Sequence, residues 1–277
     1  MPRSRRLLPA PLDRLAGAVA PPWRPGALSS GGLAGSGARL LRPALWLLVA
    51  AAAVQSLLHL VDLAVFDLRL DRINADKDAS VAGWLGTVTT WSTALGALLL
   101  ALLARAVRAP MLALAGLCGF LSLDDMVVLH EIVANVAQRF DAYGHDGYTF
   151  WPLVYFPLMC VVGWLLLRTA RSVDVGTGRF LVAGLACLVS AVALEATAPV
   201  LYALGSDHGQ PLYELEVTVE EALETLGWGA IALGLLSVTV DLLLARGAVL
   251  GAPFDRRGPV TSARPDGQRR GDRVTAP

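Results

Sequence analysis

Acidic and imidazole side chains occur inside stretches of this sequence that are otherwise apolar. The most concentrated group is the segment LSLDDMVVLHE at residues 121–131, which carries Asp124, His130 and Glu131. Asp124 and Glu131 are seven residues apart, so on one continuous helix they would lie on nearly the same face. Carboxylate and imidazole groups are ligands for Mn, Fe, Zn, Mg or Ca ions. We therefore predict that this segment contributes to a divalent metal site.

Other apolar stretches carry residues of the same types. Glu195 lies in one and His59 in another, while Glu216, Glu220 and Glu224 form an i, i+4, i+8 stripe in a third. Carboxylates four residues apart on a helix repel one another, so this stripe needs protons, basic partners or a bound cation. Basic residues are scarce in the neighbouring loops, which favours a bound metal ion or protonation.

The predicted metal ligands come from four apolar stretches: His59, Asp124, His130, Glu131, Glu195, Glu220 and Glu224. Three of them, Asp124, Glu131 and Glu195, are also the candidate catalytic residues. Carboxylates that hold a metal ion can position the water molecule that the ion activates. The ligand types do not determine which metal binds, or whether one binds.

Two alternative roles remain open at this stage. His59 would serve equally as a hydrogen-bonding residue between two helices. Glu216 and Glu220 would serve equally as solvated residues of an outer loop. The sequence also lacks the Glu-x-x-His pairs of di-iron bundles and the His-Glu-x-x-His pattern of zinc proteases.

The composition of the chain is that of a membrane protein. Of its 277 residues, 55% are hydrophobic and 17% are charged, and the mean hydropathy is +0.56. So few polar residues would not cover the surface of a water-soluble domain. The net charge is zero, which argues against nucleic acid as a partner. Three cysteines lie within apolar stretches, where they are typical small hydrophobic residues.

Six stretches are long and apolar enough to cross a bilayer as helices. A span requires about 20 mostly apolar residues, because every backbone polar group must be paired inside the membrane. The predicted spans are residues 44–66, 82–103, 110–136, 150–167, 180–204 and 219–244. The predicted fold class is all-α, a six-helix transmembrane bundle. Counted by helical rise, the candidate ligands lie roughly 21–33 Å from the cytoplasmic ends of their spans, so they overlap in height.

Basic residues are distributed unevenly about these spans. Nineteen of the 23 Lys and Arg residues precede the first span, follow the sixth, or lie in the loops after the second and fourth. The positive-inside rule then places both termini in the cytoplasm of a protein of the plasma membrane or the bacterial inner membrane. Residues 1–43 are predicted to be a disordered, Arg-, Pro- and Gly-rich cytoplasmic lead. The membrane domain covers residues 44–246, and residues 247–277 form a disordered cytoplasmic tail.

The same residues resemble those of a family of uncharacterised bacterial multi-pass membrane proteins. That family has a Ser-Leu-Asp-Glu stretch followed by His-Glu on one helix, and a Glu-Glu-x-Leu-Glu stretch before Gly on the last. The matching residues are Ser122, Leu123, Asp124, Asp125, His130 and Glu131, then Glu220, Glu221, Glu224 and Gly227. Asp125 stands where the family has Glu, and an apolar stretch with one glutamate, here Glu195, is also similar. The resemblance covers residues 59–244 and implies the architecture and the site, but no reaction.

Three classes of function are compatible with these residues. The first is a metal-dependent membrane enzyme that acts on a lipid or lipid-linked substrate near the outer leaflet. The second is a transporter or channel for protons or a metal cation, with the acidic residues in its outer vestibule. The third is a non-catalytic partner or sensor with a structural ion site.

The inner halves of the spans are almost purely apolar. This asymmetry favours a site that opens to the extracytoplasmic side over a continuous pathway across the membrane. The lipid bilayer is the predicted partner, and a lipid-like small molecule or a cation is the predicted ligand. The sequence does not determine the oligomeric state.

Overall fold

The structure, a computed structural model, describes residues 28, 36–77, 79–129, 132, 150–206 and 208–251. Within these ranges all regular secondary structure is helical. The elements are α2 (Ser36–Leu40), α3 (Arg42–Val61), the π-helix η2 (Asp62–Phe66), α4 (Val81–Leu103), the 3-10 helix η3 (Arg105–Val107), α5 (Arg108–Val127), α7 (Phe150–Ala170), α8 (Val175–Glu195), α9 (Ala198–Ala203) and α10 (Pro211–Gly251). The prediction of an all-α fold is confirmed for the described residues.

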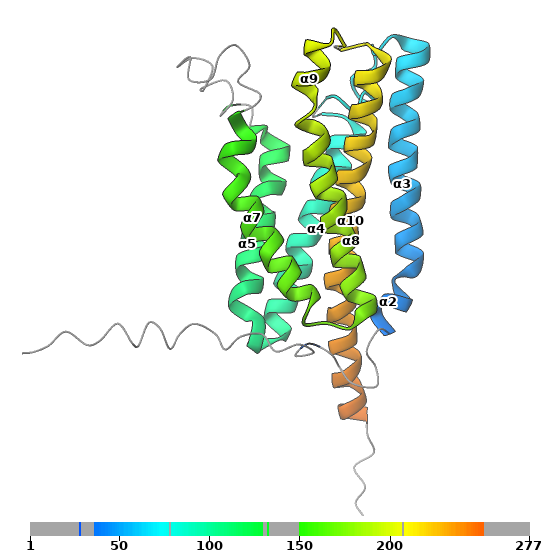
Figure 1. Ribbon diagram of the computed structural model, residues 1–277. Coiled ribbons are helices and arrows are strands. Elements are labelled where there is room, and N and C mark those ends of the chain that lie inside the picture. Colours follow the sequence, from blue (N-terminus) through cyan, green and yellow to red (C-terminus); the bar gives the residue numbers. More distant parts are fainter. Residues whose placement is uncertain are drawn as a thin grey trace, which may run out of the picture.

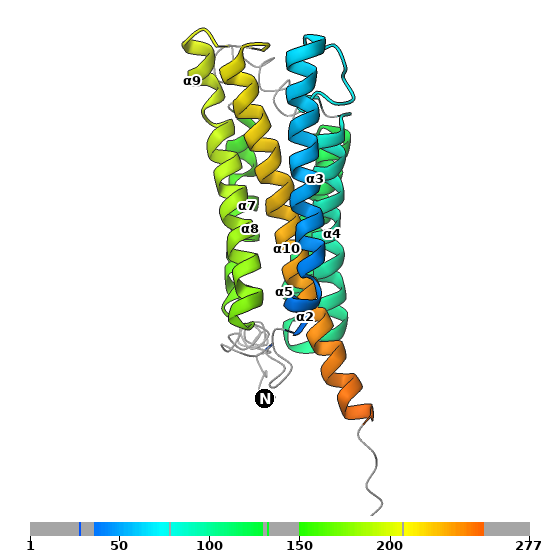
Figure 2. The ribbon, with the colours of Figure 1, turned by 90° about the vertical axis from the view of Figure 1, so that its right-hand side faces the viewer.

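The long helices lie side by side as a bundle, with α2 and the last turns of α10 at one end and α9 at the other (Figures 1 and 2). We refer to these as the α2 end and the α9 end.

Side-chain caps mark the N-terminal ends of two helices. The Ser80 side chain accepts a hydrogen bond of 3.2 Å from the Gly83 N–H at the start of α4, and Asp174 accepts bonds from the N–H groups of Gly176 and Thr177 at the start of α8.

Five helices in the described residues are long and apolar enough to cross a membrane. They span Arg42–Phe66, Val81–Leu103, Arg105–Val127, Val175–Ala203 and Pro211–Gly247, and the apolar helix Val154–Ala170 is shorter. Large apolar side chains are exposed along them, among them Trp46, Leu47 and Leu102 at 69%, 72% and 62%. Such a surface is expected where lipid rather than water covers the protein. The helices are therefore those of a multi-pass membrane protein.

The helix α10 is the centre of the bundle, because it packs against α2, α3, α4 and α8. Glycines allow the closest approach: a Cβ atom at Gly184 of α8 would lie 2.6 Å from the Gly227 carbonyl oxygen of α10. Toward the α2 end, fully buried apolar side chains such as Leu100, Met111 and Leu235 fill the space between helices. Small residues at helix contacts are the usual basis of packing in membranes, where lipid is as apolar as the core.

The prediction of one continuous span at residues 110–136 is wrong. The helix α5 ends at Val127, and Val128 adopts a left-handed conformation with φ of 57°. Asp124 and Glu131 therefore do not share one face of a continuous helix. A β-branched residue at positive φ is strained, and no glycine or proline in this part of the sequence indicates the break.

The span predicted at residues 180–204 also consists of two helices. The helix α8 ends at Glu195, and α9 begins at Ala198 with Pro199 in its first turn. The residue before a proline is disfavoured in the helical conformation, and proline itself has no N–H to continue a helix, so the break follows from Pro199.

The last helix begins earlier than predicted, at Pro211 instead of residue 219. Proline is common at the first helical position, because its missing N–H has no partner there in any case. As a result Glu216 lies inside α10 and is 8% exposed. The alternative of Glu216 as a solvated loop residue is therefore wrong.

Parts of the predicted cytoplasmic lead and tail belong to the bundle. The buried Leu28 donates an N–H bond of 3.1 Å to the Ser172 carbonyl, and the Gly37 N–H donates one of 2.7 Å to the Asp241 carboxylate. The last helix continues to Gly251, beyond the predicted boundary at residue 246. Residues 1–27, 29–35 and 252–277 lie outside the described residues.

Replacing Gly184 by alanine should destabilise the bundle, whereas replacing Gly116 should not. A Cβ atom at Gly184 collides with the Gly227 carbonyl and the Ile231 side chain, so α8 and α10 would have to separate. We expect a loss of about 1–3 kcal/mol. A Cβ atom at Gly116 meets no atom within 4 Å, and alanine favours a helix over glycine by about 0.5–1 kcal/mol. Thermal unfolding in detergent measures both variants, and equal melting temperatures would contradict the close packing of α8 on α10.

Candidate functional site

Five glutamates lie on the half of α10 nearest the α9 end, and four of them follow Glu214. Glu216, Glu220 and Glu224 follow one another at four-residue intervals and so share a face of the helix, with Glu221 beside them. Glu216 is buried, and the other three are half-buried. The stripe predicted from the sequence is thus present on a single helix, and Glu216 and Glu220 do not lie in a loop.

Two neighbouring helices bring further carboxylates to this stripe. Glu195, the last residue of α8, interacts electrostatically with Glu220 and Glu224. Asp125, in the last turn of α5, interacts in the same way with Glu221. Acidic side chains from three helices therefore lie within electrostatic range of one another. We call these five residues, Asp125, Glu195, Glu220, Glu221 and Glu224, the acidic cluster.

The ends of two helices add to the negative potential of the acidic cluster. The helix α5 ends two residues after Asp125, and α8 ends at Glu195 itself. The C-terminal end of a helix carries a partial negative charge, because its last carbonyl groups have no partner within the helix. Acidic residues at such an end are unfavourable, so this arrangement strengthens the need for a positive charge.

The ion pairs between described residues do not include Glu220, Glu221 or Glu224 of the acidic cluster. They join Asp67, Asp76 and Glu214 to nearby Arg, Lys or His residues. Within the same part of the chain, no Lys or Arg pairs with Glu220, Glu221 or Glu224. The repulsion among these carboxylates is therefore not offset by an ion pair with a described basic side chain.

Asp124 makes a separate contact between two helices. It is buried, and one of its carboxylate oxygens accepts a hydrogen bond of 2.9 Å from the Tyr155 hydroxyl of α7. The rings of Tyr155 and Phe120 stack beside this bond, with centroids 6.2 Å apart. Asp124 thus links α5 to α7 next to the acidic cluster, and its catalytic role stays a prediction.

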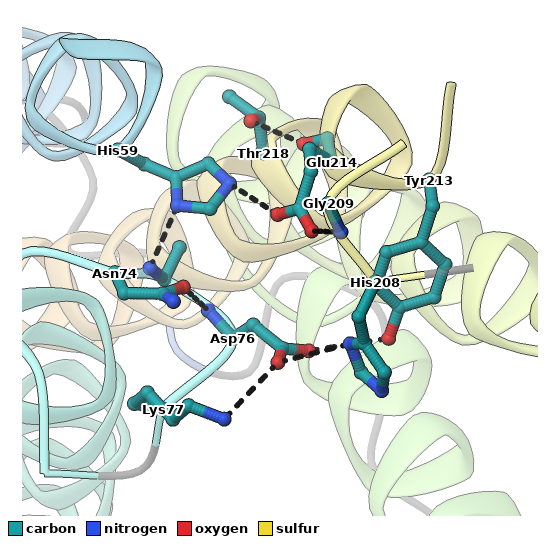
Figure 3. A network of polar contacts seen from close by, with 10 residues as sticks. His59, Asn74, Asp76, Lys77, His208, Gly209, Tyr213, Glu214 and Thr218 are labelled. Carbon is teal, nitrogen blue, oxygen red and sulfur yellow. Dashed lines mark hydrogen bonds and ion pairs between the residues drawn. The ribbon is translucent and has the colours of Figure 1, made fainter. Parts of the chain in front are cut away.

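His59 is fully buried and contacts protein groups through both ring nitrogens (Figure 3). Its Nδ1 accepts a hydrogen bond of 3.0 Å from the Ala75 N–H, so the ring proton lies on Nε2. Nε2 is 3.0 Å from a carboxylate oxygen of Glu214 on α10, whose other oxygen accepts a bond of 2.7 Å from the Gly209 N–H. The His59–Glu214 contact joins α3 to α10, which is the interhelical role that the sequence left open beside metal binding.

A second set of polar contacts surrounds Asp76 at the α9 end (Figure 3). Its carboxylate accepts a hydrogen bond of 3.1 Å from the Tyr213 hydroxyl and lies 3.6 Å from the Lys77 ammonium and 3.3 Å from Nδ1 of His208. These contacts join the α3–α4 loop to the start of α10 and to the α9–α10 loop. Together with His59, they hold both loops over the bundle.

Glu214, Asp76 and Tyr155 were not among the residues predicted from the sequence. Pro211 was the available signal for Glu214, because a helix that begins there includes it. No local pattern indicates that Tyr155 meets Asp124, or that the loop residue Asp76 faces α10. Both contacts depend on how separate elements pack.

Only part of the predicted metal site falls within the residues that the structure describes. No three His, Cys, Asp or Glu side chains of these residues are close enough to share one ion. His130 and Glu131, two of the predicted ligands, lie outside the described residues. The divalent metal therefore stays a prediction.

Residues 40–239, well over half of the chain, match the family model described as a domain of unknown function, DUF8692. The chain belongs to the DUF8692 family. The matched residues include the whole of the acidic cluster and both partners of the His59–Glu214 contact. No curated protein and no solved structure matches the chain. Membership of the DUF8692 family supplies no activity.

Replacing His59 by alanine should destabilise the protein. The substitution leaves one oxygen of the buried Glu214 carboxylate and the Ala75 N–H without a partner, and we expect a loss of about 3 kcal/mol. Glu214→Ala should cost a similar amount. The double variant should cost less than the sum of the two, because both remove the same contact. Thermal unfolding in detergent measures all three.

The matched control is Arg69→Ala, which removes an ion pair whose side chains are 79% and 82% exposed. It should leave the melting temperature unchanged. Strictly additive effects of the His59 and Glu214 substitutions would contradict a direct contact between the two side chains.

Proposed function

We propose that the protein is a multi-pass protein of the plasma or inner membrane that binds a cation at the acidic cluster from the extracytoplasmic side. One observation carries the proposal: the half-buried Glu220, Glu221 and Glu224 of α10 interact with the carboxylates at the ends of α5 and α8, and no ion pair of the described residues joins these three glutamates to a Lys or Arg. A bound cation is the simplest group that offsets this charge in a medium of low dielectric constant.

The orientation rests on the basic residues. Those at the α2 end and in the loops that join α4 to α5 and α7 to α8 outnumber those at the α9 end. By the positive-inside rule the α2 end is cytoplasmic, so both termini are cytoplasmic and the acidic cluster belongs to the outer half. Six spans, with α7 as the fourth, are consistent with this arrangement.

The chemistry of the cluster suits a hard divalent cation. Carboxylate oxygens are the preferred ligands of Mg, Ca and Mn ions. His130 and Glu131 follow the end of α5 directly in the sequence, and we propose them as further ligands. Small rotations of the glutamate side chains on α10 would then complete the coordination.

We propose metal-assisted hydrolysis of a lipid or lipid-linked substrate as the use of this ion. Fully buried apolar residues, including Leu100, Met111 and Leu235, close the α2 half of the bundle. The substrate would therefore reach the acidic cluster from the outer side. Asp124, Glu131 and Glu195 would hold the ion and orient the attacking water.

Transport of a cation is the second candidate, and the interrupted helices favour it. The helices α5 and α8 both end beside the acidic cluster, and discontinuous helices whose ends face an ion are typical of ion-coupled transporters. Rocking of the bundle would then be required to open the closed α2 half.

Binding is tested with Mn²⁺ and purified full-length protein in detergent, prepared without chelators. Wild-type protein should bind Mn²⁺ in isothermal titration calorimetry, and the double variant E220Q/E224Q should bind it at least about tenfold more weakly, equivalent to roughly 1.4 kcal/mol. Asp67→Asn removes an exposed carboxylate from the α3–α4 loop and is the matched control. Its affinity should equal that of wild type.

The proposal is overturned if wild-type protein binds no Mn²⁺ and elemental analysis finds no divalent metal. It is also overturned if Asp67→Asn weakens binding as much as the double variant, because binding would then reflect surface charge alone.

Measurements in proteoliposomes distinguish hydrolysis of a lipid from transport of the cation. Hydrolysis predicts a change in lipid composition by mass spectrometry, and transport predicts Mn²⁺ flux into the vesicles without such a change. In either case Asp124→Asn and Glu195→Gln should abolish the activity while the variants remain folded. Full activity in both variants would exclude these residues from the site.

A further inference from the structure

Glu216 carries a buried carboxylate oxygen that the cation site does not use. Its side chain is 8% exposed, and its Oε1 atom has no hydrogen-bond partner. Glu216 lies one helical turn from Glu220, on the same face of α10, and interacts electrostatically with Asp76 of the α3–α4 loop. A buried carboxylate oxygen without a partner is costly, so it indicates a group that the site is built to receive.

Asp76 connects this position to solvent. Its side chain is 18% exposed, and its carboxylate contacts the half-exposed ammonium group of Lys77 and the exposed ring of His208. Lys77 is the only lysine in the chain. The positively charged Lys77 side chain thus contacts the Asp76 carboxylate, which is the carboxylate nearest to solvent.

Carboxylates therefore form a continuous series from the α9 end to the acidic cluster. Asp76 accepts a hydrogen bond of 3.1 Å from Tyr213, which lies about one turn before Glu216 on α10, and Glu216, Glu220 and Glu224 then follow one another on the same face of that helix. Successive members on α10 are four residues apart, a rise of about 6 Å. A cation that moves along this series remains next to a negative charge throughout, which avoids the cost of an unpaired charge in an apolar medium.

We propose that Asp76 and Glu216 form an outer binding site through which a divalent cation reaches the acidic cluster, and that Lys77 competes with the cation for Asp76. This inference rests on the proposed cation binding. Glu216 acts as a transfer site between solvent and the cluster, so it affects the rates of binding and release more than the affinity. Lys77 repels an incoming cation and slows its association.

The experiment is stopped-flow binding of Mn²⁺ to full-length protein in detergent, followed by quenching of tryptophan fluorescence. Trp228 is buried on α10 one turn beyond Glu224 and is a suitable reporter. Glu216→Gln should slow both association and dissociation by about fivefold or more, with the equilibrium affinity within about threefold of wild type. Lys77→Gln should speed association at low ionic strength, and the gain should vanish in high salt.

The matched control is Arg69→Gln, which removes the same charge from the same loop but pairs with Asp67 instead of Asp76. Its association rate should stay close to that of wild type. Equal rates for wild type, Glu216→Gln and Lys77→Gln, with Mn²⁺ binding intact, would overturn the outer site and leave the acidic cluster in place. So would equal acceleration by Lys77→Gln and Arg69→Gln, since the effect would then be one of overall charge.

If Glu216→Gln does not fold, the comparison of Lys77→Gln with Arg69→Gln decides the question alone. Absence of Mn²⁺ binding by wild-type protein overturns the cation site itself, and the outer site with it. The two failures are thus distinguishable in one set of measurements.

Discussion

Repulsion among carboxylates in a medium of low dielectric constant is the constraint on which this structure depends. A charged residue at the centre of a membrane helix costs about 2.5–3.5 kcal/mol on insertion scales. The bundle nevertheless brings five acidic side chains together from α5, α8 and α10. Such an arrangement is stable only when protons or a cation offset the charge, and the ends of two helices increase that need.

The bundle is divided into two functionally different halves. Toward the α2 end, α8 and α10 approach through Gly184 and Gly227, and buried apolar side chains such as Leu100 and Leu235 fill much of the space between the helices. Toward the α9 end, the contacts of His59 with Glu214 and of Asp76 with Tyr213 hold the loops in place. The rigid apolar half positions α10, and the polar half presents its glutamates to α5 and α8.

Composition and periodicity were sufficient to predict the all-α class and most helix positions. The span at residues 82–103 differs from α4 by one residue, because the apolar stretch and the helix coincide. The break after Val127 was not predictable, because neither glycine nor proline precedes it and a left-handed valine is stabilised only by its surroundings. The acidic stripe of α10 followed from spacing alone, whereas the partner of His59 depends on the packing of two helices 155 residues apart in sequence.

The most direct test of the account is the position of Mn²⁺ in crystals of the full-length protein, measured by anomalous scattering. The account predicts a peak within roughly 2.0–2.6 Å of carboxylate oxygens of Glu195, Glu220 or Glu224. It is contradicted if these side chains point away from one another toward acyl chains, and equally if Mn²⁺ binds only at the protein surface.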